Sequence, residues 1–394
     1  MNILYISPMI IDYDNLDGVA RKLLFQKDAL ASMGVKDRMY LASFYKDDYY
    51  AVKGENYEKQ LSFENKHSKQ LNMFQIYPQI PDICEELSID AVYFRVMALS
   101  WVTNKLFSDL KKKNIKIVIE IPTYPFWKEK WMDVLACIKS GNITRGISRC
   151  GTNIIYWLYA HKLRNKIEAI VTFSNITELW GNKVIGIANG YSFEAPEHEK
   201  QLKQPCEALN LLIVASIRDN HGADRIIQGM SDYYMNGGER EIVFHVVGDG
   251  DVIPKLKALA ESNESTVNRV VFYGFKSGKQ LDAIYDLADI GVSALGFHRI
   301  GVYYCSPLKS KEYFAKGLPI VGTTAEKDIL DTDCKVYYYS VSEDDQPIDI
   351  SGLIKFYDDL WSKGTTDCDI IKSAAKHFDW NNIMRPVYKV FKPQ

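Results

Sequence analysis

Hydrophobic and polar positions alternate in long blocks along the first half of this chain. Asn2–Ser7, Asp90–Val96 and Ile115–Ile121 are short apolar runs, which predict strands buried on both faces. Between them, Val19–Met33 has a helical pattern that stops before Gly34, a residue typical of helix ends. Apolar strands separated by helices predict a parallel sheet covered by helices on both sides.

The same alternation starts again after a polar break and predicts a second domain of the same kind. The break is Ser192–Glu207, which is polar and contains two prolines. We expect strands beyond it at Leu209–Ala215, Glu241–Val247, Val267–Tyr273, Ile290–Ala294, Leu318–Val321 and Lys335–Ser340. Helices are expected between these strands at Ala223–Met235, Val252–Glu261 and Gln280–Ala288, and a last one within Ile370–Phe391.

This pattern predicts an α/β protein with two Rossmann-like, doubly wound domains. Residues 1–191 would form the first domain, 192–207 a linker and 208–377 the second domain, with the helix 378–394 packed back on the first. Ligands of open parallel sheets bind beyond the carboxyl ends of the strands. We therefore expect a ligand site in a cleft between the two domains.

Composition removes several classes of protein. The chain has 394 residues and a net charge of −2, which argues against a dedicated nucleic-acid binder. Its seven cysteines are scattered without a Cys-x-x-Cys pair, so neither a disulfide framework nor a zinc site is expected. We expect reduced thiols in a cytoplasmic protein. No apolar run approaches the roughly 18 residues that a membrane span needs, and the start lacks the basic region of a signal peptide.

The segment Cys305–Val321 carries the clearest candidate site. Ser306 is a preferred N-cap, Pro307 suits the first helical position, and Gly317 suits the position after the helix. The free N–H groups at Leu308 and Lys309, with the lysine charge, would bind an anion. Glu312, one turn further on, would accept hydrogen bonds from ribose hydroxyls, so a nucleoside diphosphate fits. The alternative is ordinary capping, with Glu312 paired to Lys309 or Lys316.

The motif Ser306-Pro-Leu-Lys-x-x-Glu-Tyr-x-Ala-x-Gly-x-Pro resembles the donor-binding helix of retaining glycosyltransferases of family 4. Four other segments resemble parts of that family in the right order: Ile187–Gly190, Val214–Arg225, His245–Gly250 and Val271–Phe275. The resemblance covers nearly the whole chain and implies the two-domain GT-B fold. It further implies that Gly274 and Phe275 lie near the nucleotide base.

The chain departs from the family at its phosphate ligands. The first of the two usual glutamates falls at Tyr304, so only Glu312 matches. The usual arginine and lysine of the first C-terminal loop fall at Ser216 and His221. Nearby cations would supply the charge instead: Arg218, Arg225, and Arg299 after His298. For Arg218 the alternative is an ordinary surface charge. Both histidines are more often structural than catalytic.

The first domain offers candidates for the other side of the cleft. Gly18 follows the first strand where the family has a glycine loop, and it would let backbone approach the donor; a plain helix start is the alternative. Glu120, Thr123 and Tyr124 end an apolar strand and would contact the acceptor sugar, unless this is only a strand ending in a proline turn.

Residues 127–168 are basic and rich in aromatics. Lys128–Glu168 contains eight Lys/Arg and three acidic residues, a local charge of +5, interleaved with tryptophan and tyrosine. Such a segment suits an anionic membrane surface, and a solvated helix pair is the equal alternative. Family members acting on lipid-linked acceptors are similar in this respect.

We expect a retaining, metal-independent glycosyltransferase that moves a sugar from a nucleotide diphosphate-sugar to a glycan or lipid-linked glycan. The family points to bacterial-type surface polysaccharide or glycoconjugate synthesis, in the cytoplasm or at the inner face of the membrane. Lys309 and Arg218 would stabilise the leaving diphosphate and Glu312 would hold the ribose. No cofactor is expected, and the Asp-x-Asp triplets are read as chance. A nucleotide-sugar epimerase and a non-catalytic sugar-nucleotide-binding subunit are the alternatives.

Overall fold

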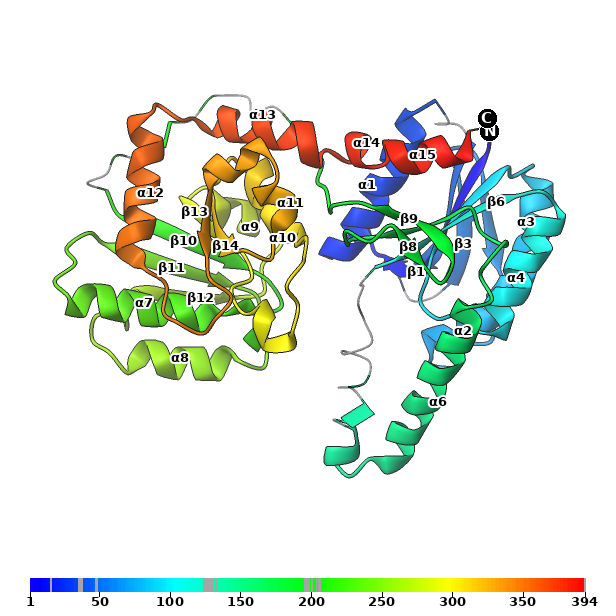
Figure 1. Ribbon diagram of the computed structural model, residues 1–394, viewed down its shortest axis with the longest axis horizontal. Coiled ribbons are helices and arrows are strands. Elements are labelled where there is room, and N and C mark those ends of the chain that lie inside the picture. The colour runs from blue at the N-terminus through cyan, green and yellow to red at the C-terminus, as the bar shows by residue number, and fades with distance from the viewer. Residues whose placement is uncertain are drawn as a thin grey trace. The chain divides into compact units, whose positions relative to one another are not determined.

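A computed structural model describes residues 1–14, 16–34, 38–46, 49–122, 131, 134–135, 137–194, 199, 201–202, 204 and 207–392. The chain divides into two compact units (Figure 1). Unit 1 comprises Met1–Ala188 and Trp380–Gln394, and unit 2 comprises Asn189–Asp379. The expected linker 192–207 is thus grouped with unit 2. Each unit has its own sheet and its own hydrophobic core.

Unit 1 is built on a 9-stranded sheet in the order β4-β3-β2-β1-β5-β6-β7-β9-β8. The strands from β2 to β9 through the centre are parallel, whereas β3, β4 and β8 pair antiparallel. Their bounds are β1 Ile3–Ile11, β2 Met39–Tyr45, β3 Tyr49–Lys53, β4 Glu58–Leu61, β5 Ala91–Arg95, β6 Lys116–Ile121, β7 Ala169–Thr172, β8 Glu178–Leu179 and β9 Asn182–Gly186.

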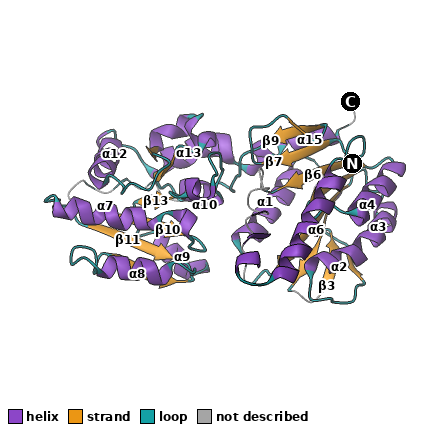
Figure 2. Ribbon diagram, turned by 60° about the horizontal axis from the view of Figure 1, so that its bottom comes forward, coloured by secondary structure: helices purple, strands orange, loops and turns teal. Residues whose placement is uncertain are grey.

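Helices cover both faces of this sheet (Figure 2). On one face, α1 packs against β1, β2 and α14, and on the other, α4 packs against β6 and α3. The helices are α1 Gly18–Ser32, α2 Lys69–Ile76, α3 Ile80–Glu86, α4 Trp101–Lys112, α6 Ile143–Ala160, α14 Trp380–Ile383 and α15 Arg385–Phe391, with a 3₁₀ turn η2 Tyr77–Gln79. The sequence pattern missed the β3–β4 hairpin, in which β4 is the edge strand and is largely exposed.

Unit 2 has a 6-stranded parallel sheet in the order β12-β11-β10-β13-β14-β15. This is the doubly wound order, in which chain direction across the sheet reverses between the first and fourth strands. The strands are β10 Leu209–Val214, β11 Ile242–Val247, β12 Val270–Gly274, β13 Ile290–Val292, β14 Ile320–Thr323 and β15 Tyr338–Val341. The prediction of two parallel α/β domains is confirmed.

The helices of unit 2 follow its strands in alternation. They are α7 Ala223–Met235, α8 Ile253–Glu261, α9 Gly278–Tyr285, α10 Leu308–Ala315, α11 Lys327–Leu330, α12 Ile350–Ser362 and α13 Asp367–Phe378, with 3₁₀ turns η3 Asp219–His221, η4 Phe297–Ile300 and η5 Asp333–Tyr337. Residues of α7, α8 and α12 share one core cluster with the sheet.

The C-terminal segment is divided between the units. The pattern predicts one helix within Ile370–Phe391, but the structure ends α13 at Phe378 and begins α14 at Trp380. Asp379 between them has an extended backbone. Trp380 and the apolar side of α15 are buried in unit 1. In the described part of the chain, no helix combines the length and hydropathy that crossing a membrane requires.

Candidate active site

The ends of α10 are set by specific residues. Pro307 is an extended N-cap, and the helix stops before Gly317, whose φ is +71°. A Cβ on Gly317 would lie 2.4 Å from the Cβ of Asp367, so glycine is needed for space as well as for conformation. The predictions of Ser306 as N-cap and Pro307 as first helical residue are wrong by one position.

Ser306 instead ties the start of α10 to its surroundings. Its hydroxyl donates to Asp328 Oδ2 at 2.6 Å and accepts from the backbone N–H of Asn189 at 2.8 Å. It is buried, so its expected role in donor binding gives way to one in positioning. No side chain among the described residues caps α10, so its first-turn N–H groups are suited to a bound anion.

Lys309, in the first turn of α10, presents an amine that the described residues do not satisfy. Part of its stem is exposed, but Nζ is buried and has no hydrogen-bond partner. Burial lowers the pKa of Lys309 to about 7, although the charge of Glu326 acts in the opposite direction. A buried amine without a partner is costly and favours an anion beside it. It therefore extends the anion site formed by the helix start.

The loop after β10 approaches the same amine. Burial lowers the pKa of His221 to about 3, and the charges of Lys309 and Arg218 act in the same direction. The backbone N–H of Arg218 donates to His221 Nδ1 at 3.0 Å. The neutral ring must then carry its proton on Nε2, which leaves that atom as a donor. The structure thus brings together Lys309, His221 and the exposed Arg218.

Glycines allow close packing of the loops at the carboxyl edge of the sheet. A Cβ on Gly248 would lie 1.8 Å from the carbonyl oxygen of Ala215, and one on Gly250 would lie 1.7 Å from that of Ile217. The backbone N–H of Ile217 donates to Asp249 at 2.8 Å. The Gly-Asp-Gly turn is therefore a spacer that positions the loop carrying Arg218 and His221.

Glu312 lies on α10 beyond the anion site. The hydroxyl of Tyr191 donates to its Oε1 at 3.3 Å. Neither Lys309 nor Lys316 forms the alternative ion pair with Glu312: Lys316 pairs with Asp282 at 2.9 Å, and Lys309 Nζ has no hydrogen bond to any described residue. The carboxylate is partly exposed, as a group that meets a ligand must be.

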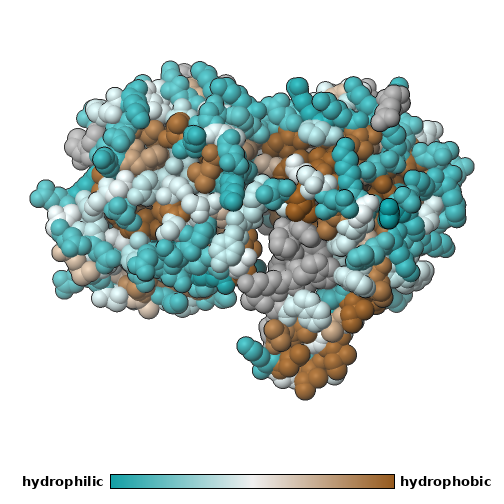
Figure 3. Space-filling model, viewed as in Figure 1, coloured by the Kyte–Doolittle hydropathy of each residue, from teal (hydrophilic) through white to brown (hydrophobic). Residues whose placement is uncertain are grey.

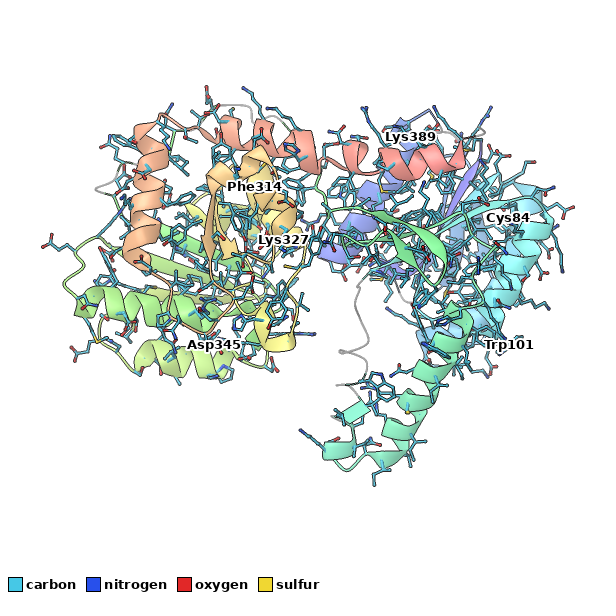
Figure 4. The ribbon with its side chains drawn as sticks, in the orientation of Figure 1. Cys84, Trp101, Phe314, Lys327, Asp345 and Lys389 are labelled. Atoms are coloured by element: carbon cyan, nitrogen blue, oxygen red, sulfur yellow. The ribbon has the colours of Figure 1, made fainter. Side chains whose placement is uncertain are left out.

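Arg299, expected at the donor, is held by carboxylates on the loops beside α10. Its guanidinium makes two hydrogen bonds to Asp224, at 2.9 and 3.0 Å, and one to Asp345 at 2.7 Å. Asp345, labelled in Figure 4, also contacts His298 Nε2 at 3.0 Å. These bonds raise the pKa of Arg299. Its positive charge is therefore compensated within the protein.

Arg225, the second of these predicted donor ligands, is also structural. It is 1% exposed and donates to the carbonyl oxygens of Leu295 at 2.6 Å and Gln346 at 2.7 Å. An ion pair with Asp344 completes its contacts. Arg225 therefore fastens α7 to the loops after β13 and β15, and a direct contact with the donor is contradicted by its burial.

A buried ionic cluster under α10 was not expected from the sequence. Lys311 and Glu326 are fully buried, and Lys311 Nζ pairs with Asp328 at 2.6 Å. Glu326 accepts a hydrogen bond from Ser293, while its Oε2 has no partner. Burial raises the pKa of Glu326 and Asp328 adds to this, although Lys311 opposes it. The sequence signal that could have indicated this cluster is the pair of acidic residues shortly after β14, Glu326 and Asp328.

Gly274 and Phe275 end β12. Gly274 has a φ of +66°, and its carbonyl oxygen accepts from the N–H of Gly248 at 2.8 Å. Phe275 is 63% exposed. An exposed ring at a carboxyl strand end suits stacking on a base, and this role stays a prediction.

All these groups of unit 2 lie around one position in the sheet. Strand order reverses between β10 and β13, which are neighbours. The loop after β10 carries Arg218 and His221, and the segment after β13 leads into α10. Crevices at such switch points are the usual ligand sites of open α/β sheets. Among the described residues around this crevice, Lys309 and Arg218 are cations for which no carboxylate partner is seen, an arrangement that suits an anion.

In unit 1, the structure corrects the expectation for Glu120. This carboxylate is fully buried and paired with Arg95, and it accepts hydrogen bonds from Tyr93 at 2.7 Å and Gln26 at 2.8 Å. Burial alone would raise the pKa of Glu120, but the Arg95 and Lys22 charges and these hydrogen bonds lower it. Glu120 therefore joins three elements and does not face an acceptor.

Gly18 is the other candidate of unit 1 that the structure describes. Gly18 begins α1, and a Cβ there would meet no atom within 4 Å, so folding does not require a glycine. Thr123 and Tyr124 lie outside the described residues, as does part of 127–168. Among the described residues, one group has ligand atoms within 4.8 Å of one another, Asp333, Cys334 and His377. It lies in η5 and α13, away from the strand-end loops.

Comparison with known proteins agrees with this architecture. Residues 208–349 match the family model described as Glycosyl transferases group 1. No curated protein sequence matches the chain.

Solved structures with similar folds extend over the whole chain. WaaG, a glycosyltransferase involved in lipopolysaccharide biosynthesis, is 13% identical with a TM-score of 0.57, and 100% of each chain is covered. HepE of Anabaena, in complex with UDP, is 12% identical with a TM-score of 0.57 and 99% coverage of each chain. Trehalose-6-phosphate synthase OtsA is 11% identical with a TM-score of 0.57, again with 100% of each chain covered.

At these identities the structural likeness shows the fold alone, and the family model concerns only the second domain. The chain therefore has the GT-B fold, and its residues 208–349 match the model of group 1 glycosyl transferases.

Proposed function

We propose that this enzyme transfers a sugar from a nucleotide diphosphate-sugar to a glycan or lipid-linked glycan acceptor, with retention of configuration and without a metal, as in family 4. The observation that carries the proposal is the buried, unpartnered Nζ of Lys309 at the uncapped start of α10. This arrangement fits a diphosphate because both the amine and the helix start favour negative charge.

The chemistry follows from charge. As the sugar–phosphate bond breaks, negative charge grows on the diphosphate and oxocarbenium character on the sugar. Lys309, Arg218 and the N–H groups of α10 would stabilise the departing diphosphate. Glu312, partly exposed on α10, would hold the ribose. We infer, from the resemblance to family 4, that the leaving phosphate itself accepts the proton of the incoming hydroxyl.

The relatives support the donor class and suggest the pathway. HepE has been solved with UDP-glucose, with a TM-score of 0.56, and WaaG takes part in lipopolysaccharide biosynthesis. We extend these to a nucleotide-sugar donor and to bacterial-type surface polysaccharide or glycoconjugate synthesis. The described cysteines are free thiols, which suits the cytoplasmic location we propose.

Donor binding is tested by thermal shift with UDP, GDP, ADP and dTDP on the wild type, on Glu312→Ala and on Glu261→Ala at the far end of α8. One nucleotide should stabilise the wild type and the control, since a ligand of the native state raises Tm by mass action. Glu312→Ala should lose most of that shift. An unchanged shift in Glu312→Ala would contradict the ribose role.

Turnover separates the proposal from its alternatives. Nucleotide release that requires an acceptor indicates a transferase, whereas sugar interconversion without an acceptor would indicate an epimerase. Donor binding with no turnover on a broad acceptor panel would indicate a non-catalytic subunit.

We further propose that α6 contacts an anionic membrane surface. Its outer stripe is apolar and exposed, with Ile147 at 68%, Ile154 at 51% and Leu158 at 46%. Its buried residues are Gly146, Asn153, Tyr156 and Ala160, of which Tyr156 and Ala160 pack in the core of unit 1. Figure 3 shows brown apolar atoms gathered over the α6 segment of unit 1, and an exposed apolar patch of this kind is typical of an interaction surface.

Charge favours a membrane as the partner of this stripe. Residues 137–167 contain no acidic residue and six basic ones: Lys139, Arg145, Arg149, Lys162, Arg164 and Lys166. Lys166 is not a free contact, because its Nζ donates to Asn104 at 2.6 Å and Ser108 at 2.9 Å. Lys139, Arg145 and Arg164 are suited to anionic lipid headgroups while the apolar stripe enters the interface.

Vesicle cosedimentation tests this contact. The wild type should bind phosphatidylcholine vesicles that contain phosphatidylglycerol, and it should bind vesicles of phosphatidylcholine alone more weakly. Ile147→Glu with Ile154→Glu should abolish binding, and Met235→Glu, equally exposed at 68% on α7, should not change it. Retained binding of the double variant would refute the proposal.

A further inference from the structure

Residues 189–191, with which the chain enters unit 2, are attached to α10 at two points. The backbone N–H of Asn189 donates to the hydroxyl of Ser306 at 2.8 Å, and the Asn189 side-chain amide donates to the carbonyl oxygen of Ser306. Two residues further on, the hydroxyl of Tyr191 donates to Glu312 Oε1 at 3.3 Å. The segment is therefore held both just before α10 and at the second turn of this helix.

The backbone of Tyr191 has an anchor of its own at the end of α13. Its N–H donates to the carbonyl oxygen of Phe378 at 2.9 Å, and Tyr191 forms a parallel bridge with Asp379. Phe378 is 1% exposed, and its ring stacks on that of Phe314 of α10, with 6.3 Å between the ring centres (Figure 4). The support of Tyr191 and its target Glu312 thus belong to one packed group of elements.

A glutamate carboxylate benefits from such a partner when it has to bind a diol. The last side-chain torsion of glutamate has a broad energy minimum, so packing alone leaves the plane of the two oxygens loosely defined. A hydrogen bond to one oxygen fixes that plane, and a carboxylate can accept further hydrogen bonds at both oxygens. Glu312 and Tyr191 are both partly exposed, so a ligand can reach this pair.

The lysines beside Glu312 do not take this role. Lys316 pairs with Asp282 at 2.9 Å, and Lys309 Nζ has no hydrogen bond to a described residue. We propose that Tyr191 is a positioning residue, whose hydroxyl orients the Glu312 carboxylate toward the two ribose hydroxyls of the donor nucleotide. The assignment rests on the proposed function, in which Glu312 holds the ribose. Tyr191 acts on the ligand through Glu312, so its effect should require both the carboxylate and the ribose hydroxyls.

Isothermal calorimetry on the full-length protein tests the dependence on the ribose. UDP, GDP and ADP are each compared with their 2′,3′-dideoxy forms, which lack both ribose hydroxyls. For the nucleotide that binds, Tyr191→Phe should weaken affinity about 3- to 10-fold, the effect of one hydrogen bond. The affinity for its dideoxy form should not change, because that form cannot use an oriented carboxylate. The melting temperature of the variant checks its folding.

Tyr234→Phe on α7 is the matched control. It too removes a tyrosine hydroxyl that donates across 3.3 Å, here to the carbonyl oxygen of Arg240. Any effect of this change should fall on the melting temperature, and not on the affinity ratio between a nucleotide and its dideoxy form. A second test adds Tyr191→Phe to Glu312→Ala. If the hydroxyl acts through Glu312, the double variant should bind the nucleotide no more weakly than Glu312→Ala alone.

Each outcome decides the proposal. A loss that is confined to the ribose form, and is absent in the Glu312→Ala background, supports it. Equal weakening of both forms by Tyr191→Phe would indicate a purely structural role and overturn it. Nucleotide binding that depends on Glu312 but not on Tyr191 would leave the proposed function intact and overturn this inference alone. No binding of any of the three nucleotides would overturn both.

Discussion

At the scale of residues, the environment of the Lys309 amine favours a bound anion. Its amine is buried without a hydrogen bond, and its pKa falls to about 7 by burial. Such a group destabilises the free protein, and a bound diphosphate would compensate it. Strongly shifted residues in a crevice are typical of functional sites.

Lys309→Met should therefore change binding and stability in opposite directions. UDP affinity should fall about 10- to 100-fold, since a hydrogen bond to a charged group contributes roughly 1.5–3 kcal/mol. The free energy of unfolding should rise by about 1–2 kcal/mol near pH 7, because a buried unsatisfied amine is removed. Calorimetry and denaturant unfolding measure the two effects, and Lys316→Met, whose lysine pairs with Asp282, is the control.

The sign of the pH dependence follows from the same pKa. Between about 7 and 10.5, Lys309 is protonated in the unfolded chain but largely neutral in the native one. The unfolded state then binds more protons, so this group makes stability rise with pH over that range. UDP affinity should fall as pH rises above about 7, because the cation is lost. A pH-independent UDP affinity in the wild type would contradict the role of Lys309.

The sequence distinguishes only some of the cations that can bind a ligand from those that have a structural role. The pattern around α10 was sufficient to select Lys309 and Glu312, because a cap, a glycine and a proline are local signals. Arg225 and Arg299 looked equivalent to Arg218 as loop cations. Their carboxylate partners include Asp344 and Asp345, which lie far along the chain. Only the fold therefore distinguishes these paired, structural arginines from Arg218.

At the scale of elements, loops at the carboxyl edge of unit 2 are packed backbone to backbone. Gly248 and Gly250 let the turn after β11 touch the loop after β10. The same turn reads in sequence as a glycine motif or an acidic triplet. Its spacing role is visible only once β10 and β11 pair in register.

Gly250→Ala should destabilise unit 2 by about 2–3 kcal/mol, the cost of overpacking at a site that cannot relax. The added Cβ would lie 1.7 Å from the carbonyl oxygen of Ile217 and displace the loop that carries Arg218. UDP-induced stabilisation should fall with it, as measured by thermal shift. Gly18→Ala is the contrast, since its Cβ meets no atom within 4 Å. Equal stability of Gly250→Ala and wild type would disprove the spacing role.

At the scale of the whole molecule, the C-terminal segment links the two units along the chain. It leaves unit 2 at Asp379 and enters unit 1 at Trp380. Trp380, Val387 and Phe391 are at most 2% exposed there, and Lys116 Nζ donates to the carbonyl oxygen of Lys392 at 2.8 Å. Unit 1 is therefore completed by residues that follow unit 2.

Truncation after Asp379 should destabilise unit 1 by roughly 5 kcal/mol, since each large buried side chain contributes about 1.5–3 kcal/mol. Unit 2 keeps its core and its anion site, so UDP should still raise its melting temperature. Differential scanning calorimetry with and without UDP resolves the two effects. Loss of the UDP shift, or an unchanged first unit, would contradict this division.

The sequence by itself determined the two α/β domains and the helix that carries Lys309 and Glu312. Strand and helix periodicity and helix-end residues are local properties, so they can be recognised in the sequence before the fold is known. Only the tertiary structure decided which charges are paired, and that Glu120 is buried and held by partners within unit 1. Those properties depend on residues distant in sequence, and pairing and burial arise only when the strands assemble.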